Sequence, residues 1–164
     1  MDEITIIEAD LAHEDHQLWV LAMEDAYAAD PLGNGGPIDP EARERLLGAL
    51  AAHPTTMIWL AMRGGTNAAK PVGIAVCFLG FSTFAAKPLI NVHDLSVIEA
   101  CRGRGVGRQL LAAVAAKGRE LGCCRLTLEV LEHNPARRLY ESAGFKQATY
   151  AEDAGGALFM MKPL

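Results

Sequence analysis

The chain has 164 residues, of which 51% are hydrophobic and 21% are charged, and its formal net charge is −5. This length predicts a single domain, residues 1–164, whose core needs no disulfide or metal support. The acidic balance argues against a nucleic-acid partner, because such binding depends on many lysine and arginine contacts to phosphates. No apolar run reaches the roughly 20 residues of a membrane-spanning helix, so no membrane partner is expected.

The first fifty residues predict one strand and two helices. Residues 3–8 have the pattern of a strand, and residues 13–29 and 41–52 have helical periodicity. The Pro/Gly-rich stretch DPLGNGGPIDP separates the helices and has the composition of a flexible lid. The first helix is predicted to carry an apolar stripe of Trp19, Ala22, Met23 and Ala26. The opening MDEITIIEAD does not resemble a secretory signal, so a cytoplasmic protein is expected.

Histidine and cysteine spacing gives no metal signature. The HEDH at residues 13–16 lacks the spacing of a two-histidine zinc helix and is better explained as a solvated helix face. The cysteines form neither a C-x-x-C pair nor a zinc ladder, which predicts buried or unused thiols and no metal. They are Cys77, Cys101, Cys123 and Cys124.

Three strand-like runs follow, at residues 55–63, 71–81 and 88–98. The GGTN between the first two predicts a hairpin, because glycine and asparagine tolerate the positive φ of tight turns. The three runs are therefore expected to form an antiparallel meander.

The third of these runs changes phase. Its apolar residues occupy even positions at Ile90 and Val92 and odd positions at Leu95 and Val97. One inserted residue, a β-bulge near His93 and Asp94, would keep all four on one face. A strand buried on both faces would need no bulge and is the alternative.

The stretch RGRGVGRQLL, residues 102–111, places glycines among arginines where a helical pattern begins. A helix start offers unpaired N–H groups and a positive dipole end, and glycines let an anion approach the backbone, so a pyrophosphate site is predicted. The loop lacks the Lys-Ser/Thr of a P-loop and the spacing and early position of a dinucleotide fingerprint. A glycine-softened turn with solvated arginines is the alternative.

The rest of the chain predicts a βαβ unit, a short helix and two strands. The helix from Val106 is expected to end at Gly122, and residues 125–131 then form a strand parallel to 88–98. NPARRLYESAGF predicts a helix capped by Asn134 and ended by Gly144. Strands are predicted at 145–151 and 156–162. The stripe of the longer helix is Val106, Leu110, Val114 and Leu121.

Two segments together resemble the GCN5-related N-acetyltransferase (GNAT) family. HDLSVIEACRGRGVGRQLL resembles its acetyl-coenzyme A signature, and LTLEVLEHNPARRLYESAGF resembles its second segment, over roughly residues 90–146. The resemblance implies an α/β fold with a mixed (α+β) sheet, largely antiparallel, in which the fourth and fifth strands are a parallel pair. It also implies direct transfer of an acetyl group from acetyl-CoA (coenzyme A as carrier) to a primary amine, without a metal.

The resemblance also implies site residues. The pyrophosphate would rest on residues 102–108, pantetheine would lie along residues 95–97, and the N–H of Val97 would stabilise the oxyanion. Tyr140 would be the general acid for the departing thiolate, or else an ordinary core tyrosine, and Asn134 a helix cap, a cofactor contact or both. The implied cofactor contacts are Leu95, Ser96, Val97, Arg102, Gly103, Arg104, Gly105, Val106, Gly107, Arg108, Asn134 and Tyr140.

The general base and the acceptor are less defined. His93 or Asp94 on the bulged strand lies close to where the acyl group is expected and could take the amine proton, directly or through water. A neutral imidazole suits this task, unless His93 is a structural histidine, whereas Asp94 would more naturally orient a cationic substrate or the histidine. Glu24, Asp25, Tyr27 and the loop at residues 31–40 are expected near the acceptor, which would be a small-molecule or peptide amine. A non-catalytic CoA-binding sensor or subunit is the alternative function, and a dinucleotide-binding oxidoreductase fits less well. A homodimer is expected by family analogy.

Overall fold

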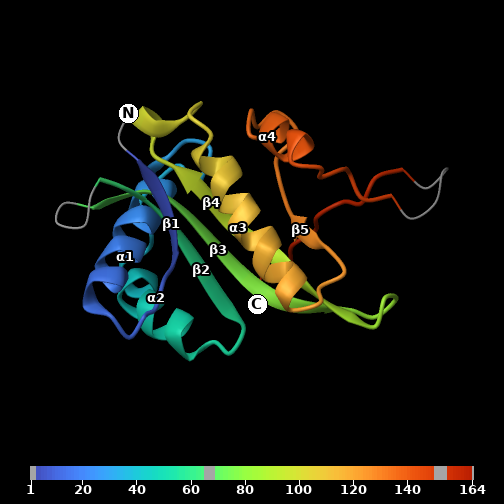
Figure 1. Cartoon of the computed structure of the whole chain (residues 1–164), viewed down its shortest axis with the longest axis horizontal. Helices are drawn as coiled ribbons and strands as arrows, with labels where there is room; N and C mark the ends of the chain where they lie inside the picture. The colour runs from blue at the N-terminus through green and yellow to red at the C-terminus, as the bar shows by residue number, and fades with distance from the viewer. Residues whose placement is uncertain (1–2, 65–68, 150–154, 164) are drawn as a thin grey trace. The chain divides into compact units, whose positions relative to one another are not determined.

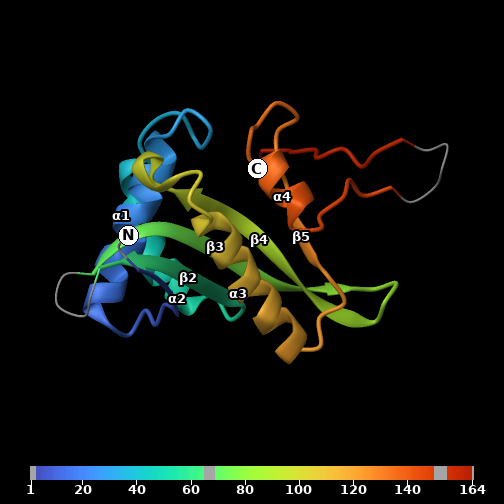
Figure 2. The same ribbon diagram turned by 45° about the horizontal axis from the view of Figure 1, so that its top comes forward.

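A computed structural model describes residues 3–149 and 155–163, except 65–68 (Figure 1, Figure 2). The chain forms two compact units, residues 1–128 and 129–164. The first unit contains β1 (Ile4–Glu8), α1 (Glu14–Ala29), α2 (Pro40–Ala52), β2 (Thr56–Arg63), β3 (Lys70–Ser82), β4 (Lys87–Val97), a 3₁₀ turn (Glu99–Cys101), α3 (Val106–Glu120) and β5 (Leu126–Leu128). The second unit contains α4 (Arg137–Ser142).

The five strands form one sheet in the order β1-β2-β3-β4-β5. Neighbours from β1 to β4 are antiparallel, and β4 and β5 are parallel. The predicted meander and mixed sheet are thus confirmed. The GGTN turn lies mostly outside the described residues, although the antiparallel pairing of β2 with β3 agrees with it.

Helices cover both faces of the sheet, with α3 on the opposite side from α1 and α2 (Figure 1, Figure 2). On the α1 and α2 face, the core consists of Val20, Met23, Leu50, Ile58, Leu60, Met62, Ile74 and Val76. The predicted stripe of α1 is partly wrong, because Ala22 and Ala26 are exposed while Val20 and Met23 are buried. A valine or methionine has more apolar surface to remove from water than an alanine, so the larger residues decide which face packs.

Two glycines let α3 lie close to the other face. A Cβ on Gly73 would be 3.1 Å from Leu110 Cδ1 and 3.2 Å from Val106 Cγ1. A Cβ on Gly118 would be 3.5 Å from Ile90 Cδ1. The start of α3 is therefore held against the strands that form the centre of the sheet.

The end of α3 corrects one predicted core residue. Val106, Leu110 and Val114 are buried, as expected, but Leu121 is 41% exposed. Leu121 is the C-cap, and the chain turns away at Gly122, whose φ is 67°. Leu121 therefore lies beyond the last turn that packs on the sheet.

The predicted β-bulge is confirmed in β4. Asp94 pairs with Val76 and Val92 pairs with Cys77, so His93 is the extra residue opposite the Val76–Cys77 step. Because directly paired residues share a face, the bulge puts Leu95 on the α3 face with Val92. It also turns Asp94 to the face that α1 covers.

In the second unit, α4 begins at Arg137 with Ala136 as its N-cap, so the prediction that Asn134 caps this helix is wrong. Asn134 Oδ1 accepts the N–H of Ala136 at 2.9 Å, so its side chain closes a turn before the helix. Gly144, with φ 94°, ends the helix as predicted.

The predicted terminal strands are not confirmed. No strand is assigned at residues 145–149 or 155–163, and residues 150 and 151 lie outside the described part. One backbone bond, from Ala157 N–H to the Ala148 carbonyl at 3.1 Å, joins the two segments. Leu158 and Met160 are 86% and 85% exposed, so little apolar burial supports a strand pair here. The strand predicted at 125–131 is likewise shorter, ending at Leu128.

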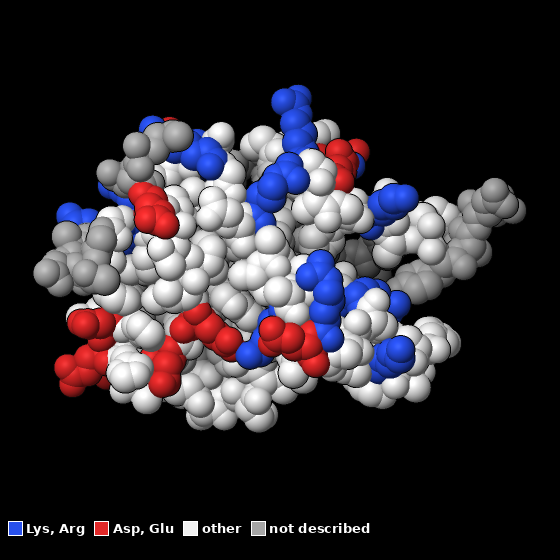
Figure 3. All heavy atoms as spheres, viewed as in Figure 1, with Lys and Arg blue, Asp and Glu red and all other residues white. Residues whose placement is uncertain are grey.

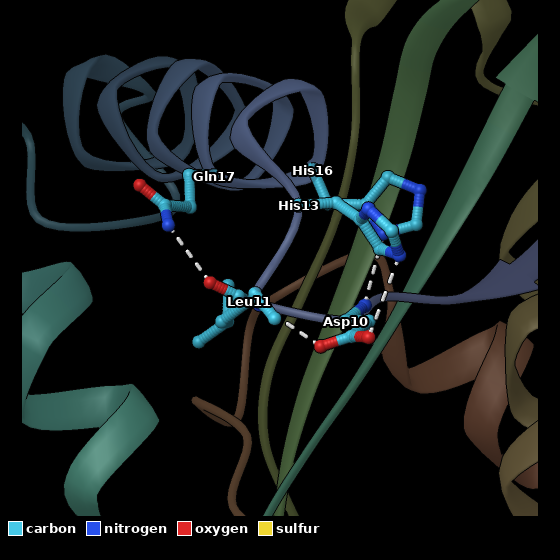
Figure 4. Close-up of polar contacts among 6 residues, drawn as sticks. Asp10, Leu11, His13, His16 and Gln17 are labelled. Carbon is cyan, nitrogen blue, oxygen red and sulfur yellow. Dashed lines mark hydrogen bonds and ion pairs between the residues drawn. The ribbon is translucent and has the colours of Figure 1, made fainter.

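The two histidines of HEDH turn toward Asp10 at the start of α1 (Figure 4). The N–H of Asp10 donates to His16 Nδ1 at 2.9 Å, and His13 Nε2 lies 3.6 Å from Asp10 Oδ2. Among the described residues, no cluster of His, Cys, Asp or Glu has the form of a metal site. These histidines thus organise the entry into α1.

Candidate active site

The loop before α3 and the first turn of this helix, residues 102–108, form an open stretch of backbone that we call the cradle. Gly105 is the N-cap with φ 82°, and Gly103 has φ 73°. Among the described residues, a Cβ at either position would meet no heavy atom within 4 Å, and no side chain caps the helix. The first N–H groups of α3 and its positive dipole end therefore face a space that an anion can enter. The backbone fits a diphosphate.

The three arginines around this cradle are not equivalent. Arg104 and Arg108 are exposed, and basic side chains are visible over the loop that opens α3 (Figure 3). Arg102 is exposed as well, but its guanidinium contacts protein groups: its Nε donates to the Val97 carbonyl at 2.9 Å, and its Nη2 pairs with Asp30. This pairing holds the pKa of Asp30 below its ordinary value. Arg102 thus ties the loop to the end of α1.

The end of β4 leads directly to the cradle. Ile98 N–H donates to the Val72 carbonyl at 3.0 Å. Bonding positions alternate along an antiparallel pair, so the N–H of Val97 points to the other edge of β4. Pairing with β5 covers that edge only from Ile90 to Val92. Residues 93–97, which include half-buried Leu95 and buried Ser96, therefore continue past β5.

A cavity of about 450 Å³ lies on the α1 side of the bulge. Its lining residues are Glu24, Tyr27, Ala28, Gly33, Asn34, Ile38, Asp39 and Asp94. Gly33 is required by close packing, because a Cβ there would be 2.1 Å from the Tyr27 carbonyl oxygen. The loop after α1 therefore forms a wall of this cavity.

Burial and like charge shape the ionisation of this cavity. Burial, helped by the charges of Asp94 and Asp25, raises the pKa of Glu24 to about 8. Burial also raises the pKa of Asp94, and neighbouring His93 partly opposes this shift. The pKa of Tyr27 is raised by burial and by Asp94, Glu24 and Asp30. Both carboxyl groups are therefore harder to ionise in this cavity than they would be in water.

Two predicted site residues point elsewhere. The exposed His93 ring packs against Phe78 at 5.4 Å between centroids and is not among the residues lining the cavity. Asp25 forms a two-pronged ion pair with Arg43, at 2.8 and 2.7 Å, and is also outside that lining. Asp25 therefore joins α1 to α2.

Two of the predicted site residues lie in the second unit. Asn134 caps the turn before α4, and Tyr140 lies on α4, with its ring 6.1 Å from that of Phe145. Tyr140 is half-buried.

Two acidic residues were not named individually by sequence reasoning, although Asp39 lies in the loop at residues 31–40 that was expected near the acceptor. Asp30 caps the end of α1, and Asp39 caps the start of α2 and lines the cavity. Both lie in the DPLGNGGPIDP stretch, where an aspartate followed by proline is also an ordinary turn signal. Only the fold distinguishes the two uses.

The Acetyltransferase (GNAT) family model matches residues 12–145. The chain belongs to this family. The match includes the α3 cradle, the bulged strand and α4, which confirms the resemblance derived from the signature segments.

Individual relatives match over shorter stretches. An uncharacterized N-acetyltransferase of Bacillus subtilis (strain 168), YycN, is 40% identical over 57 residues, which cover 34% of this chain and 36% of that protein. A thialysine N-epsilon-acetyltransferase of Bos taurus is 33% identical over 82 residues, which cover 49% of this chain and 48% of that protein. The matched regions thus span about a third to a half of these relatives.

Solved structures support the GNAT fold. A probable acetyltransferase has a TM-score of 0.75 at 24% identity, covering 97% of this chain and 99% of that one. The aminoglycoside N-acetyltransferase AAC(6')-Iy, in complex with CoA, has a TM-score of 0.73 at 18% identity, covering 99% and 96%. At these identities the likeness establishes the fold.

The contacts of Arg102 with Val97 and Asp30 lead to a testable prediction about its role in this GNAT chain. If Arg102 braces the α1 loop, Arg102→Gln and Asp30→Asn should each raise KM for the amine, by about three- to tenfold, and the double variant should add little more. The pair is partly exposed, so stability should change by less than about 1 kcal/mol. Steady-state kinetics with both substrates checks this. A rise in the acetyl-CoA KM alone, seen in Arg102→Gln but not in Asp30→Asn, would instead make Arg102 a phosphate ligand.

Proposed function

We propose that this chain is an N-acetyltransferase that uses acetyl-CoA and a primary amine. The observation that supports this most strongly is the position of β4 between two sites. Its end leads into the anion cradle of α3, and its bulge carries Asp94 into the acidic cavity. A donor held along residues 95–97 and an acceptor in the cavity would meet at this strand, which favours direct transfer.

The cradle holds the donor by its diphosphate. The backbone N–H groups at the start of α3, with Arg104 and Arg108 near them, bind the phosphates. Acetyl-CoA supplies the activated thioester. The N–H of Val97, directed to the open edge of β4, donates to the thioester oxygen and stabilises the charge that develops there.

The cavity holds the acceptor and takes its proton. Asp94, rather than His93, is the base that we favour, because Asp94 lines the cavity. As the nitrogen–carbon bond forms and the carbon–sulfur bond breaks, the amine proton passes to the Asp94 carboxylate, directly or through water. Tyr140 protonates the departing thiolate, and Asn134 contributes to the cofactor site, as the family resemblance implies.

Amine-dependent release of free thiol from acetyl-CoA tests the function. We expect turnover with at least one member of a primary-amine panel, and a raised Tm on addition of CoA alone. Gly105→Ala should weaken CoA binding, because its φ of 82° strains any residue with a Cβ. Binding of CoA without turnover of any amine would favour the non-catalytic sensor. Absence of both would reject the proposal.

Three wider expectations remain predictions. They are a single functional domain made of both units, a homodimer, and a cytoplasmic location. The structure adds that, in the described part of the chain, no helix is both long and apolar enough to cross a bilayer.

A further inference from the structure

Glu24 is an unusual residue to line a cavity, because it is an acid that is almost completely buried. Its side chain is on α1, the residue is only 9% exposed, and its Oε1 has no hydrogen-bond partner among the described residues. A buried acceptor without a partner is costly, and the cost is larger when the group is charged. Because Glu24 lines the cavity, a bound molecule can supply the missing donor.

The charges around Glu24 indicate which charge the bound molecule must carry. On the outside, Asp25 is paired with Arg43 and Asp30 with Arg102. Inside, the described lining contains the carboxyl groups of Glu24, Asp39 and Asp94 and no Lys or Arg. Asp25 and Asp30 are therefore paired with arginines. In the described lining, Asp39 is exposed and caps α2, Asp94 has His93 beside it, and buried Glu24 has no cationic partner.

The reacting amine cannot balance this charge, because it must lose a proton before it attacks. Asp94 lies on the bulged strand, near the donor, while Glu24 and Asp39 come from α1 and the start of α2. A second positive group on the same acceptor would meet these two acids while its first amine faces Asp94. A charge-assisted bond from an ammonium would also satisfy Oε1 of Glu24.

We infer that the acceptor is a dication, a small molecule with a second ammonium group that Glu24 binds while the first amine is acetylated at Asp94. This inference rests on the proposed function and specifies its substrate. A volume of about 450 Å³ lies within the range of small-molecule sites. A short α,ω-diamine can therefore be held entirely within it.

The test compares α,ω-diamines of three to six carbons with monoamines of the same chain length. For the best diamine, kcat/KM should exceed that of its matched monoamine by at least about tenfold. Glu24→Gln should reduce this preference to within about threefold, mainly through KM of the diamine. Glu14→Gln, which removes one exposed carboxylate from the same helix, should keep the preference.

The pH dependence gives a second signature. Glu24 faces Asp94 of β4, Asp39 at the start of α2, and Asp25 and Tyr27 of its own helix, and its pKa is about 8. Below that pH a second ammonium must displace the Glu24 proton, so the diamine preference should increase with pH and level off near 8. In Glu24→Gln it should not vary with pH.

Stability separates a binding role from a folding role. The pKa of Glu24 is higher in the folded chain than its ordinary 4.5, so the folded state loses stability as pH rises from about 4.5 to about 8. Glu24→Gln should therefore have a Tm higher than wild type by about 4 °C or more at pH 9. Loss of diamine preference in a more stable variant cannot be attributed to misfolding.

The outcomes distinguish a failure of this inference from a failure of the proposed function on which it rests. If monoamines and diamines are turned over with equal kcat/KM, the inference that the acceptor is a dication is wrong. The proposed acetyltransferase function is then still supported. A preference that survives in Glu24→Gln also overturns it, because another group then holds the second charge. No turnover of any amine rejects the proposed function itself.

Discussion

Asp94→Asn should lower kcat/KM by about 100-fold or more, because general bases contribute on this scale. Asparagine keeps the size of the side chain and its place on the bulge but cannot accept the amine proton. It also removes one of the charges that add to the effect of burial on Glu24, so the pKa of Glu24 should fall but remain above its ordinary value. Steady-state rates between pH 5 and 9, with CoA binding measured in parallel, check both effects.

The acidic side of the pH profile identifies the base. The pKa of Asp94 is raised by burial, so wild-type activity should be lost as pH falls through a value above 3.8. This limb should be missing from the residual activity of Asp94→Asn. His93→Ala provides the matched comparison at the adjacent bulge residue. If His93→Ala loses the limb and Asp94→Asn retains it, histidine is the base.

Tyr140→Phe should lower kcat by about tenfold to a thousandfold, because the departing thiolate would lose its proton donor. Phenylalanine keeps the ring and its edge contact with Phe145, so the fold of α4 should be preserved. CoA affinity and Tm should remain close to wild type. Single-turnover rates with saturating acetyl-CoA measure the chemical step directly.

A kcat within about twofold of wild type would remove Tyr140 from the chemistry. A large loss of CoA affinity with unchanged kcat would instead make it a cofactor contact. Asn134→Ala serves as the comparison on the preceding turn, where the loss of a 2.9 Å side-chain bond should act through stability and cofactor binding.

Sequence patterns were most informative where the chain's own geometry is constrained. The phase change between Val92 and Leu95 could be explained by a bulge because side chains alternate strictly along a strand. The glycines at 103 and 105 predicted a bare helix start because few other residues adopt positive φ. Alanine positions were less informative, and Ala22 and Ala26 proved to be exposed.

Charged residues could not be placed in the same way. Glu24 and Asp25 are neighbours on one helix, but the first is buried against a cavity and the second is paired with Arg43 on the surface. Arg102 belongs to the signature loop, yet its guanidinium reaches Asp30. The partner of a charged side chain depends on segments that are distant in sequence, and periodicity carries no information about them.

The sequence by itself determined the order of strands and helices up to α4, the bulge, the anion cradle and the family, because each follows from local backbone preferences and side-chain periodicity. Only the tertiary structure decided which acids share a cavity. Folding α1 over the bulge of β4 removes water from Glu24 and brings Asp94 near it. Burial then raises the pKa of both carboxyl groups, and the charge of Asp94 raises that of Glu24 further. These pKa shifts depend on which residues pack together in the folded chain.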